Sequence, residues 1–112
     1  MGADAFHVAY GLRWEIDASS ESEITLLERR QDPRQLAAKL HELDCWLGVT
    51  TDQERYFLLV GKLVGNFGWE GKHTATLGDA EQARLISETR AKLLAGGFES
   101  EPGWHYQFEP DC

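Results

Sequence analysis

The sequence predicts a single α+β domain, residues 1–112, in which an antiparallel sheet carries two main helices in the order β-α-β-β-α-β. Three observations support this prediction. The length of 112 residues is usual for one domain. Runs of strand-forming character occur near both ends of the chain and in its middle. Stretches with helix start signals and apolar residues at helical spacing separate these runs.

The first predicted strand covers residues 6–16, where apolar and polar residues alternate. The face opposite the apolar residues carries polar side chains, among them His7, Arg13 and Glu15. A strand with one apolar and one polar face is half-buried. The apolar set is Phe6, Val8, Tyr10, Leu12, Trp14 and Ile16.

The connection that follows is predicted to be helical. Ser20 and Glu23 have the spacing of a capping box, which predicts a helix over residues 21–30. Asp32 and Pro33 give a stronger start signal, with Asp32 as N-cap and Pro33 at the first helical position. The buried face of this helix is predicted from leucines at helical spacing, namely Leu36, Leu40 and Leu43.

The two middle strands are predicted at residues 45–50 and 55–64. In the first of them, Cys45 is expected to be a small core residue. The second is apolar on both faces, which is typical of a central strand that is covered on both sides. One face holds Tyr56, Leu58, Val60 and Val64, and the other holds Phe57, Leu59 and Leu63.

The glycine-rich segment at residues 65–71 is predicted to be a loop or wide hairpin with Trp69 near its tip. We expect Trp69 either to fold back onto the core or to anchor a partner. The glycines lack the spacing of a phosphate-binding loop. An extra short strand is predicted near residues 73–77.

The last helix is predicted to start at Asp79 and to end at Gly96-Gly97. A final strand follows Pro102-Gly103. The helix is expected to bury Ala83, Ile86, Leu93 and Leu94. In the strand, Trp104, Tyr106 and Phe108 alternate with His105, Gln107 and Glu109.

This order of elements resembles the ferredoxin-like topology. The resemblance implies that the first and third strands are central, and that the helices cover one face of the sheet and leave the other open. That topology supports many unrelated functions, so it predicts none.

Composition narrows the classes of function. With 19 acidic and 11 basic residues the net charge is -8, which argues against nucleic acid and anionic membranes as partners. The sequence lacks a secretory signal and a long apolar run, so a cytoplasmic location is expected. Its two cysteines and four histidines do not have metal-ligand spacing, so we predict no metal and no cofactor.

One polar group is predicted on the open face of the sheet. If the first and last strands pair antiparallel, Arg13 lies nearer His105 and His7 lies nearer Glu109, with Gln107 between them. Such pairs are the ordinary covering of a solvated face. The alternative is a ligand or acid/base site that uses histidine and carboxylate.

The apolar residues on the same face suggest a function. Phe57, Leu59 and Leu63 need a cover. A second copy of the chain in a homodimer, the glycine loop with Trp69 folded over them, or a separate protein partner or apolar ligand would supply it. Together with Trp69 they form the predicted interaction face. We therefore expect a non-enzymatic interaction domain, such as an accessory, inhibitor or immunity-type protein, with an apolar sheet face rimmed by acidic residues. One alternative is a small-molecule-binding protein or cofactor-independent enzyme with its site in a dimeric sheet cavity. Another is a structural homodimer subunit. Catalysis has no motif in its favour.

Overall fold

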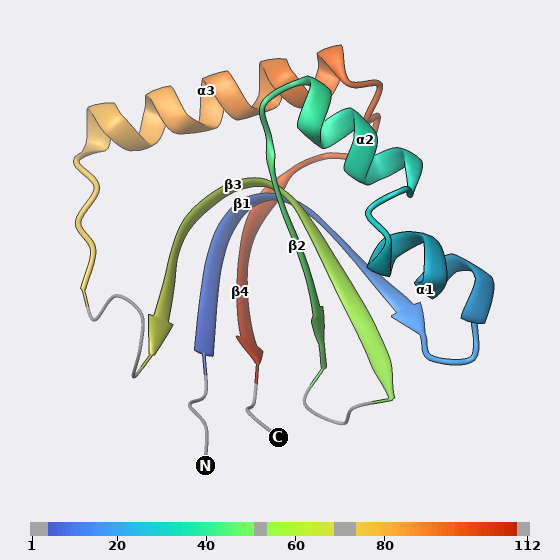
Figure 1. The fold of residues 1–112 in the computed structure, drawn as a ribbon. Helices are drawn as coiled ribbons and strands as arrows, with labels where there is room; N and C mark the ends of the chain where they lie inside the picture. Colours follow the sequence, from blue (N-terminus) through green and yellow to red (C-terminus); the bar gives the residue numbers. More distant parts are fainter. Residues whose placement is uncertain (1–4, 51–53, 69–73, 110–112) are drawn as a thin grey trace.

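The computed structural model describes residues 5–50, 54–68 and 74–109. It is an α+β fold with a four-stranded antiparallel sheet in the order β2-β3-β1-β4 (Figure 1). The predicted central position of the first and third strands is confirmed. The strands are β1 (Ala5–Asp17), β2 (Asp44–Val49), β3 (Arg55–Gly68) and β4 (Gly103–Glu109). The helices are α1 (Glu21–Glu28) and α2 (Pro33–Leu40) between β1 and β2, and α3 (Asp79–Ala95) between β3 and β4.

The sheet is bent into an arch, with the helices on its outer side (Figure 1). Gly11 of β1 lies opposite Gly61 of β3, midway along the paired strands. A Cβ atom on Gly11 would lie 2.1 Å from the carbonyl oxygen of Val60, and one on Gly61 would lie 2.1 Å from that of Tyr10. Only glycine permits so close an approach of two backbones, and glycine pairs of this kind mark sharp bends in sheets.

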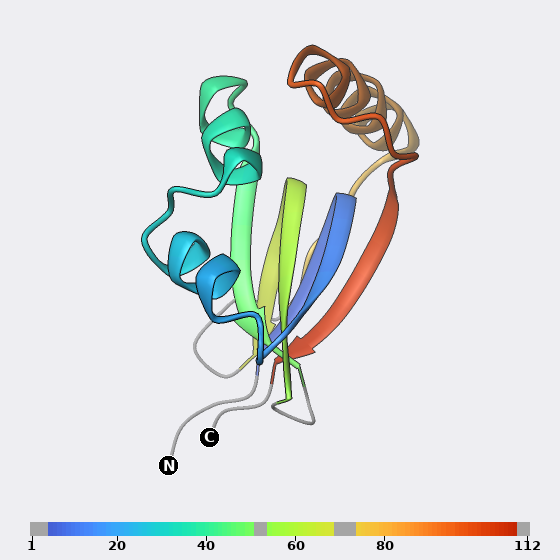
Figure 2. The same ribbon diagram turned by 90° about the vertical axis from the view of Figure 1, so that its right-hand side faces the viewer.

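The main core lies between the helices and the outer side of the arch. Figure 2 shows α1 and α2 toward the β2 side of the sheet and α3 toward the β4 side. The core residues are Leu12, Ile16, Leu58 and Val60 from the sheet and Ile24, Leu27, Ala38 and Leu93 from the helices. The predicted division of the 55–64 strand into two apolar faces is confirmed, because Leu58 and Val60 belong to this core while Phe57 and Leu59 belong to a second cluster.

The start of α2 agrees with the prediction. The Asp32 carboxylate accepts a hydrogen bond from the backbone N–H of Arg34 at 2.9 Å, and Gln35 Oε1 accepts one from the backbone N–H of Asp32 at 3.2 Å. The Arg34 guanidinium also donates to the Asp32 carboxylate, and this holds the pKa of that carboxyl below its ordinary value. Asp32 therefore anchors both the helix and an ion pair.

Replacement of Asp32 by alanine is expected to lower the free energy of unfolding at pH 7 by about 1–2 kcal/mol, the usual value of a lost N-cap. Because the pKa of Asp32 is lowered by folding, its contribution is present above its unfolded pKa and is lost as the pH falls through its folded pKa. Urea unfolding at pH 7 and below pH 4 checks this. The difference between wild type and Asp32→Ala should shrink at the lower pH, and Asp32→Asn, which keeps an acceptor oxygen, should lose less at pH 7. An equal difference at both values would contradict a role for the carboxylate charge.

The predicted buried face of α2 is wrong for Leu36 and Leu40, whereas Leu43 packs against the main core as expected. Leu36 and Leu40 are 54% and 77% exposed, and the helix rests on Ala38 and Gln35 instead. Ala38 is small enough to bring the helix close to the sheet. Gln35 is buried because its amide is fully used, since Nε2 donates to the carbonyl of Leu27 at 2.9 Å while Oε1 accepts from Asp32.

Two helix predictions need smaller corrections. Ser20 is the N-cap of α1, but its side chain makes no capping hydrogen bond, and the Glu23 carboxylate pairs with Arg34 at 2.7 Å instead of closing the capping box. In α3 the buried residues are Thr89 and Leu93, whereas Ala83 and Leu94 are exposed and Ile86 is half-buried. The helix is held at its middle by Arg90, which donates to the hydroxyl of Tyr10. Gly78, one position before Asp79, is its N-cap.

The prediction of a loop or wide hairpin in the glycine-rich segment at residues 65–71 is wrong for its first part. Gly65–Gly68 continue β3 and pair with the beginning of β1, so the predicted loop at 65–71 is strand as far as Gly68. Residues 74–77 do not form the predicted extra strand. β1 has no place for a further strand along this length, because it already has β3 on one side and β4 on the other. His73 and Trp69 lie outside the described residues.

Candidate functional site

The residues predicted as a ligand site meet on the inner side of the arch, but with different neighbours. His7 lies opposite Gln107, not nearest Glu109, and His105 lies opposite Ala9. Arg13 Nε donates to Gln107 Oε1 at 2.8 Å, so Arg13 contacts Gln107 instead of His105. His105 Nε2 lies 3.1 Å from the carbonyl oxygen of Gly11. The side chain of Glu109 lies outside the described part of the structure.

The bend of the sheet explains these contacts. The ring centroids of His7 and Phe57 are 6.3 Å apart. Phe57 is paired with Glu15, eight positions after His7, and a straight strand would separate those positions by about 26 Å. The two halves of the arch must therefore fold toward each other. His7 also stacks on Trp46 of β2, with centroids 4.8 Å apart.

This closure covers the apolar residues that were predicted to form an interaction face. Phe57 and Leu59 are only 0% and 2% exposed, and Leu63 is half-buried. Trp46 and Leu63 pack against them, and the Arg13 guanidinium carbon lies 5.7 Å from the centre of the Phe57 ring. A partner could therefore reach this inner face only at its rim. Part of the expected cover comes from the chain itself.

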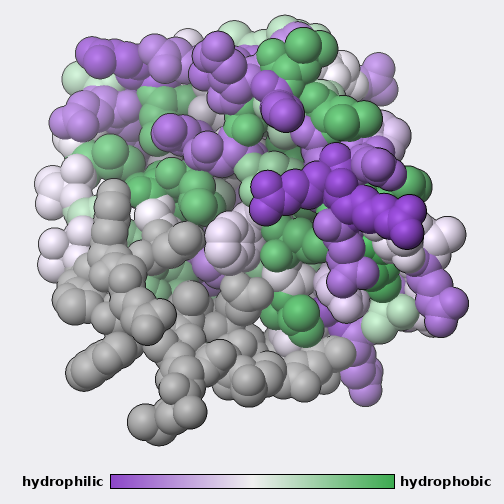
Figure 3. Space-filling model, viewed as in Figure 1, coloured by the Kyte–Doolittle hydropathy of each residue, from purple (hydrophilic) through white to green (hydrophobic). Residues whose placement is uncertain are grey.

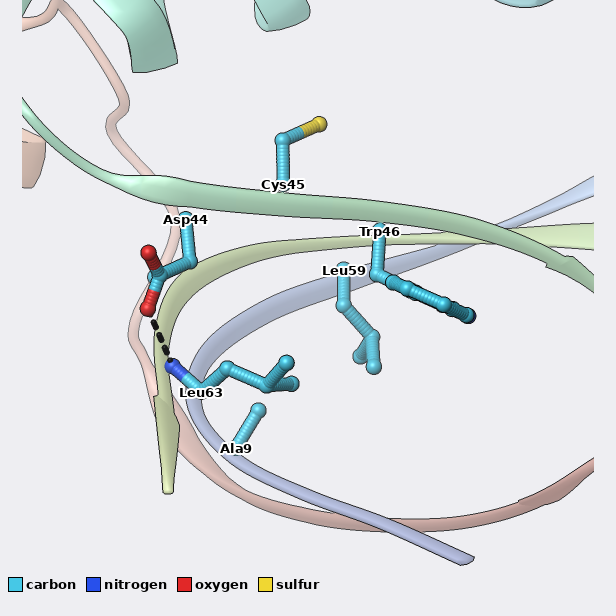
Figure 4. Close-up of a pocket in the computed structure, with 7 residues that line it drawn as sticks. Ala9, Asp44, Cys45, Trp46, Leu59 and Leu63 are labelled. Atoms are coloured by element: carbon cyan, nitrogen blue, oxygen red, sulfur yellow. Dashed lines mark hydrogen bonds between the residues drawn. The ribbon is translucent and has the colours of Figure 1, made fainter. Parts of the chain in front are cut away.

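Little space remains inside the arch. Figure 4 shows Ala9, Leu59, Leu63 and Trp46 projecting toward one another from β1, β3 and β2, and Cys45 on the opposite side of β2. The cavity among them has a volume of about 10 Å³, which is the space of one water molecule. Trp46 Nε1 is buried there without a hydrogen-bond partner. Around Ala9, Trp46, Leu59 and Leu63 the described part of the inner face is packed core, with room for about one water molecule.

A larger hollow lies on the other side of β2. A groove of about 790 Å³ runs between β2 and the helices α1 and α2. Figure 3 shows hydrophobic surface over α2 next to strongly hydrophilic side chains. The groove is lined by Leu27, Glu28 and Arg30 from α1 and its end, by Gln35, Leu36 and Lys39 from α2, and by Leu43, Cys45, Trp46 and Leu47.

The backbone of β2 presents free hydrogen-bonding groups to this groove. The N–H of Thr50 donates to the carbonyl of Arg55, so these two residues form a hydrogen-bonded pair of the antiparallel ladder. Such pairs alternate with pairs whose N–H and C=O groups point away from the partner strand. With the register of β2 and β3, the outward groups belong to Cys45 and Leu47. Within the described part of the chain they have no other backbone partner.

The groove is also electrostatically distinct. It carries two cationic side chains, Arg30 and Lys39, and one anionic side chain, Glu28, in a chain whose net charge is -8. Among the described residues neither cation has an ion-pair partner. Arg30 holds the left-handed backbone position that ends α1, with φ of 58°, a position that glycine usually occupies. An arginine there costs some backbone strain and adds positive charge at the groove.

Cys45 was expected in the core, but it is exposed and lines the groove. Cys45 lies on the edge strand β2, which among the described strands has a neighbour, β3, on only one side. Partial burial of the thiol against the groove wall raises its pKa to about 11. The thiol is therefore neutral at pH 7 and contributes apolar surface to the groove instead of a reactive nucleophile.

Neither metal ligands nor known relatives identify a function. The described residues contain no group of histidine, cysteine and carboxylate side chains that would hold a metal ion. None of the helices in the described ranges has the length and apolar character needed to span a membrane. Comparison with protein-family models, curated proteins and solved structures found no match for the chain.

The groove residues Arg30, Lys39, Cys45 and Leu47 were not among the sequence candidates. Their one available signal was the short second strand, which has few of the charged residues that usually protect a sheet edge. The predicted topology placed this strand at an edge of the sheet. Nothing in the sequence indicated that a groove would separate the strand from α1 and α2.

Proposed function

We propose that this chain is a non-enzymatic protein-interaction domain that binds an extended segment of a partner protein along the free edge of β2. The observation that carries the proposal is that three successive residues of β2, Cys45, Trp46 and Leu47, line one groove. Side chains of successive strand residues point to opposite faces, so a hollow that touches all three follows the edge of the strand. Strand addition at such an edge is a common mode of peptide recognition.

The lining of the groove indicates the chemistry of the segment. The N–H and C=O groups of Cys45 and Leu47 would pair with the backbone of the added strand. Leu36 and Leu43 offer apolar surface for its alternate side chains, and Arg30 and Lys39 attract carboxylates. The expected ligand is a segment in which apolar and acidic residues alternate.

An accessory, inhibitor or immunity-type protein remains the role that this surface fits best. The inner sheet face contributes less than the sequence predicted, because Phe57 and Leu59 are already covered. The alternative of a small-molecule site or cofactor-independent enzyme has weaker support, because the cavity among Ala9, Trp46 and Leu59 has a volume of only about 10 Å³.

We also propose that the architecture is ferredoxin-like, with α1 and α2 together as the first helical connection and α3 as the second. The support for this assignment is the central position of β1 and β3 and the helices on one side of the sheet. It adds nothing to the functional proposal, since this topology carries many functions.

Selection from a library of random decapeptides should yield segments with alternating apolar and acidic residues. Cys45→Pro should bind the selected peptide at least about tenfold more weakly, because proline removes an outward N–H and disturbs the edge. The proline leaves the β2–β3 hydrogen bonds intact, since the Cys45 N–H points away from β3. In hydrogen exchange, the amides of Cys45 and Leu47 should exchange fast in the free protein and become protected by the peptide, whereas those of Trp46 and Gly48 should be protected in both states.

Arg30→Gly is the matched control for folding. Glycine relieves the left-handed backbone strain at position 30, so this variant should be at least as stable as wild type. It should nevertheless bind the peptide up to about fivefold more weakly, as expected for a lost exposed charge pair. If no peptide is selected, or if Cys45→Pro binds the selected peptide as wild type does, the proposal is wrong.

A further inference from the structure

Among the described strands, β4 lies at the second edge of the sheet, and its outer side has no neighbouring strand. In the part of β3 that pairs with β2, every second residue, counted from Arg55, directs its backbone N–H and C=O toward β2. Gly61 is one of these residues. Its partner Gly11 therefore points its own groups at β4, where it pairs with Gly103. Continuation of this alternation along β4 directs the backbone groups of Trp104, Tyr106 and Phe108 outward, away from β1.

The same three residues form an aromatic row on the helix side of the sheet. Tyr106 is 66% exposed and Phe108 is also exposed, while Trp104 is partly covered by Tyr10, with ring centroids 5.2 Å apart. Phe6 of β1 extends the row, with its ring centroid 6.4 Å from that of Tyr106. A hollow of about 290 Å³ lies beside the row, between Trp104, Tyr106 and the Ala75–Leu77 region. Exposed aromatic surface of this kind is typical of a binding site.

The edge lacks the features that normally prevent strands from pairing. Glu109, the last residue of β4, is the one charged residue of the strand, and residues 103–108 contain no lysine, arginine, aspartate or glutamate, in a chain with 30 charged residues among 112. Natural edge strands are usually protected by charge, proline or bulges. Because residues 103–108 carry no charge, two molecules of net charge -8 can meet here with little direct repulsion.

We propose that a second copy of the chain pairs with this edge, β4 against β4, antiparallel about a twofold axis at Tyr106. In this register Tyr106 faces Tyr106 of the second copy, and Trp104 faces Phe108 of the second copy. All outward backbone groups then find partners, and the strand is paired along its whole length from Gly103 to Glu109. The aromatic rows meet on one face, and the adjoining hollow gives their side chains room to pack.

A second copy fits this edge better than an unrelated strand because the edge complements itself. An isologous contact needs the same surface on both molecules, and a strand with an odd number of residues centred on an outward-facing position satisfies its own antiparallel pairing. Pairing of β4 with β2 of another molecule would instead be heterologous and would propagate into filaments. This inference is independent of the proposed peptide groove, which lies at the opposite edge of the sheet.

Sedimentation and disulfide trapping test the register. Tyr106→Cys, in a Cys45→Ser/Cys112→Ser background, should form a covalent dimer under mild oxidation, because the Cα atoms of a hydrogen-bonded antiparallel pair lie about 5.5 Å apart. Phe108→Cys in the same background should not, because its copies would be four strand positions out of register, about 13 Å apart. Wild type should sediment as a dimer, and Tyr106→Lys as a folded monomer.

Three results would overturn the proposal. They are a monomeric wild type at the highest soluble concentration, equal trapping of the two cysteine variants, and species larger than a dimer that disappear in Cys45→Pro. The variant His105→Lys is the control for added charge alone. Its backbone points at β1, and its side chain lies on the opposite face from the aromatic row, so it should remain dimeric. Circular dichroism shows whether each variant is folded.

Discussion

Replacement of Gly61 by alanine is expected to lower the free energy of unfolding by about 4 kcal/mol or more, a large part of the stability of a domain of this size. The new Cβ atom would lie 2.1 Å from the carbonyl oxygen of Tyr10 and 2.7 Å from the Cα of Gly11. Both obstacles are backbone atoms of a central strand, so they cannot move aside as a flexible side chain would. Relief requires that β1 and β3 separate, which breaks the pairing at the bend. Urea unfolding followed by circular dichroism measures the loss.

Gly103→Ala is the matched control. Gly103 is paired with Gly11 as Gly61 is, but a Cβ atom added there meets nothing within 4 Å. The two substitutions add the same methyl group to the strands on either side of β1, and only Gly61→Ala creates a backbone clash. We expect Gly103→Ala to change stability by less than about 1 kcal/mol. Similar losses in the two variants would mean that the arch tolerates separation of its central strands.

The strands were predictable because their signal is local. The alternation of apolar and polar residues in 6–16 indicates a strand covered mainly on one face, and the two apolar faces of 55–64 indicate a strand covered on both. Both strands are central, as expected. The glycine-rich end of β3 was mistaken for a loop because glycine is also the main turn residue. It is strand here because Ala5–Val8 supply a pairing partner, and that partner is remote in sequence.

The helix faces were less predictable because they depend on contacts between elements. Leucine spacing along α2 indicated a buried Leu36 and Leu40, yet the polar Gln35 is buried because its amide bonds to α1. A short helix buries few residues, so a single side-chain hydrogen bond such as that of Gln35 is enough to decide which face of the helix is turned toward the core. Leu36, one of the two leucines left exposed by this orientation, lines the groove.

The inner face could be predicted only in part. The sequence correctly placed Phe57, Leu59 and Leu63 on one side of β3, but it suggested that another molecule or Trp69 would have to cover them. Trp69 lies outside the described residues. Part of the cover is provided by His7 and Arg13, which come from both ends of β1. Their approach depends on the bend at Gly11 and Gly61. Two separate glycines do not reveal from the sequence that they will lie opposite each other.

Substitution of Phe57 by alanine is expected to lower the free energy of unfolding by about 3–5 kcal/mol, the range for a fully buried aromatic residue. The side chain is 0% exposed and is the largest of the fully buried set. It fills the space between the two halves of the arch, where it contacts the ring of His7 and the guanidinium of Arg13. Loss of the ring leaves a cavity that the sheet can close only by bending further, and the glycine pair is already at its closest approach. Urea unfolding measures the loss.

Leu63→Ala separates this effect from a general loss of apolar surface. Leu63 lies on the same face of β3 but is only half-buried, so its truncation should cost about 1–2 kcal/mol. The indole Nε1 proton of Trp46 is buried in the wild-type structure. If Phe57 holds the arch closed, this proton should exchange with solvent much faster in Phe57→Ala than in Leu63→Ala. Equal losses of stability and equal exchange in the two variants would indicate that the inner face is an open surface in solution. It would then again be available to a partner, as the sequence first suggested.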